Sequence, residues 1–177
     1  MTAFGAHERT RRGRRDDWLT PRDLIERLGP FDLDPCAPTN PPWPTAAAMI
    51  APPDDGLALP WWGRVWCNPP YAEVGRWVKR CAEYGSAVAL IFARVDTAWW
   101  WRWVWGAATS VFFFKGRLRF QRPERPEDRH AGAGAASALV TWCPDEATRV
   151  RAALARPRPW VAYEVVVSRC HATEASA

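Results

Sequence analysis

This sequence of 177 residues has few of the features that mark membrane or secreted proteins. Although 48% of the residues are hydrophobic, glycine, proline and charged residues interrupt every apolar run before the roughly 18 residues that a membrane span needs. Residues 1–15 have no apolar stretch and no small-residue cleavage site, so they do not resemble a secretory signal. We therefore expect a soluble, cytoplasmic protein with no membrane partner.

The sequence also lacks paired cysteines and histidines at the spacing of metal ligands. The five cysteines are an odd number and include no Cys-x-x-Cys pair, and the three histidines lie far apart. This pattern excludes a disulfide framework and favours buried free thiols with no metal site. The cysteines are Cys36, Cys67, Cys81, Cys143 and Cys170.

Lysine is almost absent, since only Lys79 and Lys115 occur among the 24 basic residues. The net charge is +5, and residues 1–15 hold five arginines against Glu8 alone, which is +4 of that total. Arginine is well suited to phosphates and base edges, so we expect DNA as a partner of this flexible basic tail, although a GC-rich genome would also favour arginine. The predicted DNA-binding residues of the tail are Arg9, Arg11, Arg12, Arg14 and Arg15.

The first regular elements are predicted from capping residues and prolines. Thr20 is expected as the N-cap of a helix with Pro21 in its first position, and Gly29-Pro30 ends that helix. A short strand at Phe31–Leu33 leads into Asp34. Residues 36–55 are rich in proline and predict a long ordered loop, with at most one helical turn at 45–49.

Strands and helices alternate along the rest of the chain. Strands are expected at 63–67, 87–92, 111–114, 138–143 and 160–167, and helices at 74–82, 97–105 and 145–154. This order predicts an α/β fold, a three-layer sandwich with a mostly parallel sheet, as one minimal domain. The domain should cover residues 16–169, followed by a frayed end at 170–177.

The motif Asn68-Pro69-Pro70-Tyr71, directly after a predicted strand, suits chemistry on an amino group of a nucleic-acid base. The lone pair of such an amine is delocalised into the ring, and two hydrogen-bond acceptors would localise it: the Asn68 side-chain oxygen and the Pro69 carbonyl. Tyr71 would stack on a base turned out of its duplex. A proline-rich turn would use the same residues, but the preceding strand favours the catalytic interpretation.

Five segments together resemble the phage-type, Dam-like DNA N6-adenine methyltransferases, over residues 16–143. This resemblance implies a Rossmann-like class I methyltransferase fold, S-adenosylmethionine as cofactor, and DNA as substrate, with no metal. The segments are Trp18-Leu19-Thr20-Pro21, Asp34-Pro35-Cys36-Ala37, Asp55-Gly56-Leu57, Asn68-Pro69-Pro70-Tyr71 and Gly116-Arg117-Leu118-Arg119-Phe120.

The resemblance also implies where the cofactor lies. The first two segments would hold its methionine end through Trp18, Thr20, Pro21, Asp34, Pro35, Cys36 and Ala37, and Asp55, Gly56 and Leu57 would face its adenine. The chain departs from the family after Asp34, where two or three glycines are usual and residues 36–39 have none. A turn cap at Asp34 and a surface turn at 54–56 are the structural alternatives.

For other aromatic and basic residues, the sequence allows either a functional or a structural role. Trp18 and Trp43 are candidates for pocket walls, whereas the tryptophans of residues 99–105 suit the core or an oligomer contact better than base stacking. Arg117 and Arg119 are expected to contact phosphate, with a solvated loop as the alternative.

Three other functions share these motifs. N4-cytosine methylation opens the motif more often with serine, and glutamine methylation on a protein does not explain the basic tail. A DNA-binding protein that keeps the fold without catalysis is the third alternative, favoured by the glycine-poor segment after Asp34.

Overall fold

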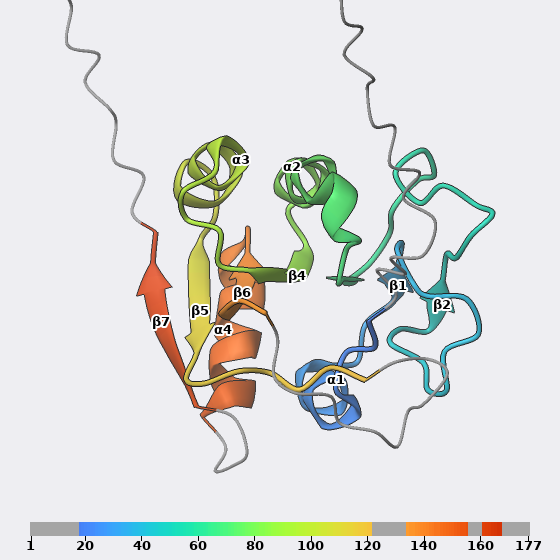
Figure 1. Ribbon diagram of the computed structural model, residues 1–177, viewed down its shortest axis with the longest axis horizontal. Helices are drawn as coiled ribbons and strands as arrows, with labels where there is room; N and C mark the ends of the chain where they lie inside the picture. Colours follow the sequence, from blue (N-terminus) through green and yellow to red (C-terminus); the bar gives the residue numbers. More distant parts are fainter. Residues whose placement is uncertain (1–17, 122–133, 156–160, 168–177) are drawn as a thin grey trace, which may run out of the picture.

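The computed structural model describes residues 18–121, 134–155 and 161–167 (Figure 1). The basic tail predicted at residues 1–15 and the frayed end predicted at 170–177 lie outside the described residues. Residues 122–133 lie outside them as well.

A seven-stranded sheet of order β2-β1-β3-β4-β6-β5-β7 forms the centre of the described fold. Strands β2, β1, β3 and β4 pair in parallel, and β6 runs antiparallel to both β4 and β5. Strand β5 therefore points the same way as the first four, and only β6 and β7 point the other way. The strands are β1 Leu33–Asp34, β2 Ala48–Met49, β3 Val65–Cys67, β4 Ala87–Phe92, β5 Ser110–Phe114, β6 Ser137–Thr141 and β7 Ala162–Val166.

Helices cover both faces of this sheet (Figure 1). Helices α2 and α3 lie on one face, and α1 and α4 lie on the other, so the fold is the three-layer Rossmann-like α/β sandwich that the sequence predicted. The helical elements are α1 Arg22–Leu28, η1 Tyr71–Glu73, α2 Val74–Tyr84, α3 Ala98–Trp100, η2 Trp101–Trp105 and α4 Pro144–Leu154. None of the helices in the described ranges has the length and apolar character needed to cross a membrane.

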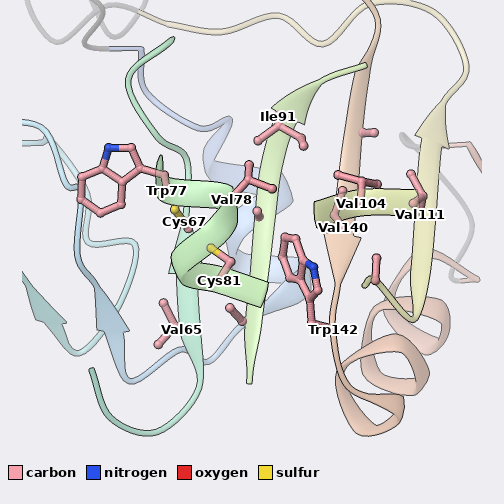
Figure 2. Packing of buried hydrophobic residues seen from close by; sticks show 14 of the residues in the cluster. Val65, Cys67, Trp77, Val78, Cys81, Ile91, Val104, Val111, Val140 and Trp142 are labelled. Carbon is pink, nitrogen blue, oxygen red and sulfur yellow. The ribbon is translucent and has the colours of Figure 1, made fainter. Parts of the chain in front are cut away.

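Two hydrophobic clusters join these layers. Strand side chains alternate between the faces, so Val65 of β3 packs in the first cluster and Trp66 in the second, and both are fully buried. Figure 2 shows the first cluster, in which Val78 and Cys81 of α2 lie over β3 and β4. The second cluster contains Leu24, Ile25 and Leu28 of α1 with Val150 and Ala153 of α4.

The start of α1 differs from the prediction. The carbonyl of Pro21 accepts the first hydrogen bonds of the helix, from the backbone N–H groups of Leu24 (3.0 Å) and Ile25 (3.1 Å). Pro21 has a ψ of 128°, so it is the N-cap itself, and Thr20 is not the cap. Thr20 lies next to Leu19, which pairs with Gln121, and this pairing keeps the backbone before the helix extended.

The helical turn expected at 45–49 was wrong, because residues 48–49 form strand β2. Backbone N–H groups of Ala48 and Ile50 donate to the carbonyls of Asp32 (2.9 Å) and Asp34 (2.8 Å). This short strand depends on its neighbour β1 for every inter-strand bond, and prolines before it disfavour a helix. A two-residue strand held by its partner has no periodicity that a sequence could reveal.

A helical segment is confirmed at the tryptophan-rich residues 97–105, but only its first part is an α-helix. Helix α3 covers Ala98–Trp100, and the chain continues in a wider turn, in which the Gly106 N–H donates to the Trp101 carbonyl at 3.0 Å. Trp100 is fully buried and Trp101 is 63% exposed. The core interpretation therefore holds for Trp100, and three of its neighbours pack partly against the first cluster: Trp99, Trp103 and Trp105.

Candidate active site

A cleft of about 190 Å³ opens where strands β1, β2 and β3 end. Because these strands are parallel, the chain that leaves each of them does so at the same edge of the sheet, where ligands of α/β folds gather. The cleft is lined by Trp18, Pro35, Cys36, Ala37, Pro38, Ile50, Pro52, Asp54, Asp55, Gly56, Asn68, Pro70 and Trp77.

The cleft brings together residues from four of the segments that the sequence singled out. The predicted residues that line it are Trp18, Pro35, Cys36, Ala37, Asp55, Gly56, Asn68 and Pro70, and those that do not are Thr20, Pro21, Asp34, Leu57, Pro69 and Tyr71. Trp43, the other residue expected in a pocket wall, does not line this cleft and packs partly buried against the second cluster.

Sequence reasoning missed Asp54 and Trp77 as cleft residues, together with Pro38, Ile50 and Pro52. Trp77 lies on the buried face of the amphipathic helix α2, where the periodicity cannot separate a wall of the cleft from the core. The adjacency of Asp54 to Asp55 in a turn was the only signal for that residue.

Asp34, at the end of β1, does not line the cleft but bonds to the turn that does. Its side chain is 2% exposed, and it accepts the backbone N–H of Cys36 at 3.0 Å and the hydroxyl of Thr45. Burial raises the pKa of Asp34 to about 6, and these hydrogen bonds partly oppose that rise. The turn-cap alternative therefore describes this side chain, which fixes the turn that leads to Cys36.

The turn around Gly56 packs tightly against the turn after β1. A Cβ atom on Gly56 would lie 1.8 Å from the carbonyl oxygen of Pro35, so no other residue fits there without a shift. The indole of Trp61 donates to the Gly56 carbonyl at 2.8 Å, and Asp55 accepts the backbone N–H of Leu57 at 2.9 Å. These contacts hold the exposed Asp55 beside the cleft, and Leu57 turns away to pack against the first cluster.

Cys36, which lines the cleft, contacts a second thiol, that of Cys67. The sulfurs of Cys36 and Cys67 are 3.6 Å apart, and burial raises the pKa of Cys36 to about 11 and that of Cys67 well above its usual range. Both thiols therefore stay protonated near neutral pH and behave as apolar wall atoms. Within the described ranges, no group of three or more cysteine, histidine and acidic side chains is placed to hold a metal ion.

Asn68 follows β3 and is anchored by the segment before α1. Its Nδ2 donates to the backbone carbonyl of Trp18 at 2.9 Å, across 50 positions of sequence. The side chain is half-buried and faces the cleft. Pro69 is buried and Pro70 borders the cleft, so the motif is a rigid rim of the site.

Tyr71 begins η1 and belongs to a group of three aromatic rings. Its ring lies 4.1 Å from that of Phe92 at an angle of 14°, and Phe92 meets the edge of Phe120 at 6.5 Å. One face of Tyr71 is thus covered by Phe92, the last residue of β4. Phe92 reads in the sequence as part of a buried strand, which is why its place beside the motif was missed.

The segment after β5 carries two of the predicted DNA contacts. Arg117 and Arg119 are exposed and alternate with the buried Leu118 and Phe120. An antiparallel bridge between Leu19 and Gln121 places this segment beside the N-terminal side of the cleft. The five tail arginines, Arg9, Arg11, Arg12, Arg14 and Arg15, lie outside the described residues.

A family model described as DNA N-6-adenine-methyltransferase (Dam) matches residues 7–158. The chain belongs to this family. The resemblance seen in the sequence is therefore confirmed, and the family's activity is methylation of adenine N6 in DNA. Neither the search of curated proteins nor the search of solved structures found a match.

The match covers the whole cleft of this Dam-family chain. It includes every segment that lines the cleft and both exposed arginines after β5, and it ends before β7. Strand β7 is therefore an edge strand beyond the matched region, on the far side of the sheet from β1 and the cleft.

Proposed function

We propose that this Dam-family chain transfers the methyl group of S-adenosylmethionine to N6 of an adenine turned out of DNA into the cleft. S-adenosylmethionine supplies an electrophilic methyl group on a sulfonium sulfur. The observation that carries the proposal is that one cleft is lined by Trp18, the turn after β1, the turn at Asp55 and the rim at Asn68. These segments are distant in sequence, and the parallel strands β1, β2 and β3 bring them to one edge of the sheet.

The chemistry of the cleft residues fits this cofactor. The molecule carries a sulfonium cation, an ammonium group and an aromatic base, and the cleft offers the carboxylates of Asp54 and Asp55 and the rings of Trp18 and Trp77. Cys36 and Ala37 would replace the glycines usual in the family, because small side chains still allow close approach of the backbone. Thr20, Pro21, Asp34 and Leu57 would act by holding these walls.

The target amine would be oriented by the rim of the cleft. Asn68 Oδ1 and the Pro69 carbonyl would accept its two N–H bonds, directing the nitrogen lone pair toward the methyl group. Tyr71 would stack on the adenine, and Phe92 packs against the Tyr71 ring at 4.1 Å. The chain would gain rate mainly by positioning the two reactants.

DNA would be held by arginines around the cleft. Arg117 and Arg119 are exposed on a segment paired with Leu19, next to Trp18 of the cleft wall. The tail arginines would add contacts to phosphates, which position the duplex without reading its sequence.

Transfer of a labelled methyl group tests the proposal. The chain is incubated with S-adenosylmethionine carrying a tritiated methyl group and with duplex DNA or protein extract, and the label is followed. We expect label in DNA, and an Asn68→Ala variant that transfers at least roughly 100-fold more slowly while binding the cofactor with unchanged affinity by calorimetry. Cofactor binding without transfer, no binding at all, or label in protein alone would each contradict the proposal.

A further inference from the structure

We infer that the backbone carbonyl of Trp18 is a positioning group, which fixes the Asn68 amide with its oxygen toward the target amine. The inference rests on the proposed function, because it concerns how the acceptor in that reaction is oriented. It assigns to the segment before α1 a role in base chemistry in addition to its place in the cofactor wall.

The direction of the Asn68 amide follows from its partner. A backbone carbonyl can only accept a hydrogen bond, so the atom that faces the Trp18 oxygen at 2.9 Å has to be the amide nitrogen. The oxygen of the planar amide then points away from Trp18. Within the described part of the chain no hydrogen bond reaches this oxygen, and Asn68 lines the cleft. Asn68 therefore offers the cleft an acceptor and keeps its donor occupied.

The Trp18 carbonyl is itself held in place by backbone pairing. The next residue, Leu19, donates its N–H to the Gln121 carbonyl at 2.9 Å and accepts the Gln121 N–H at 3.5 Å. Leu19 is 3% exposed, so this bridge is packed into the fold. Because both ends of the Trp18–Asn68 hydrogen bond are anchored, the amide has little freedom to turn over.

This arrangement distinguishes an amide from a carboxylate at position 68. An ionised aspartate would place a second acceptor against the Trp18 carbonyl, where two oxygens repel each other. A protonated aspartic acid could donate its O–H to Trp18 and still present its carbonyl oxygen to the cleft. An Asn68→Asp variant should therefore have a raised pKa at that carboxyl and work only in its protonated form.

The pH profile of methyl transfer tests the inference. Wild type, Asn68→Asp and Asn68→Ala are compared at saturating cofactor and DNA from about pH 5.5 to about pH 8.5, well above the usual carboxyl pKa of about 3.9. At pH values above its raised pKa, the rate of N68D divided by that of wild type should increase about tenfold for each unit by which the pH falls. N68A should stay slow at every pH. An N68D variant with the wild-type profile, or as slow as N68A at every pH, would overturn the inference.

A second measurement separates this inference from the proposed function. In ¹⁵N-labelled protein without DNA, the side-chain amide signals of Asn68, assigned by their loss in N68A, should include one proton protected from exchange with solvent. Two freely exchanging protons would overturn the positioning role. A protected proton in a protein that transfers no methyl group would refute the proposed function and leave the orientation of Asn68 established.

Discussion

At the scale of single residues, much of the site was visible in the sequence because its residues carry local chemistry. The Asn-Pro-Pro-Tyr motif needs only its own order and the strand before it. The turn cap at Asp34 was one of the two roles that the sequence offered, but the hydrogen bond from Thr45, eleven positions away, could not be predicted from local chemistry. Phe92 and Trp77 were missed since an aromatic residue in a buried pattern looks like core until its neighbours are known.

The buried carboxyl of Asp34 predicts a pH-dependent stability. Its pKa is raised from 3.8 to about 6, so the folded chain binds a proton more tightly than the unfolded chain. The free energy of unfolding should then fall as pH rises between these values, by about 3 kcal/mol from this group. Asp34→Asn, which cannot titrate, removes this dependence.

Urea unfolding of wild type and Asp34→Asn at several pH values measures the effect. The stability of wild type minus that of the variant should decrease from pH 4 to about pH 7, and contributions from other carboxyls cancel in the difference. A difference that stays constant over this range would show that Asp34 is not buried as the structure has it.

At the scale of elements, strong periodicity or composition predicted well and partner-dependent elements did not. Helix α2 follows from apolar residues at helical spacing, and β3 and β4 follow from apolar runs. Strand β2 pairs only with β1, and η2 is a wider helical segment of five residues that follows α3 directly. Neither feature has a local sequence pattern from which it could be predicted.

The aromatic group of Tyr71, Phe92 and Phe120 joins η1, β4 and the segment after β5, and its loss should weaken substrate binding selectively. Phe92→Leu removes the ring that backs Tyr71, so the KM for DNA should rise about 3- to 10-fold, the value of an aromatic pair. Affinity for S-adenosylmethionine should not change, because Phe92 does not line the cleft.

Phe113→Leu is the matched control for this experiment. Its ring belongs to a separate group of aromatic rings and lies 6.3 Å from that of Trp100 and 6.5 Å from that of Trp105. It should lower stability and leave the KM for DNA unchanged. Equal changes of the KM for DNA in both variants would mean that the Tyr71–Phe92 pair does not contribute specifically to binding the base.

At the scale of the whole molecule, the charge distribution predicts that the tail contributes affinity for DNA, while the domain determines site preference and cofactor binding. Five arginines between positions 9 and 15 contribute most of the net charge of +5. If they contact phosphates, each contact should add about 0.9 to the salt slope of DNA binding. Deletion of residues 1–15 should therefore weaken binding to all duplexes, while the site preference and cofactor affinity survive.

Binding to two unrelated duplexes at several salt concentrations measures this contribution. A full-length variant with glutamine in place of the five tail arginines removes the charge but keeps the residues. It should bind DNA as weakly as the deletion variant does. An unchanged salt slope would show that the tail does not touch DNA, and weaker binding to only one duplex would show that it reads bases.

The identity of the methylated base tests the central claim most directly. Duplex DNA treated with the chain and S-adenosylmethionine is digested to nucleosides and analysed by mass spectrometry, with Asn68→Ala as control. We predict N6-methyladenine in the wild-type digest and its near absence in the control. N4-methylcytosine in place of N6-methyladenine, or no methylated nucleoside from folded, cofactor-bound protein, would contradict the account.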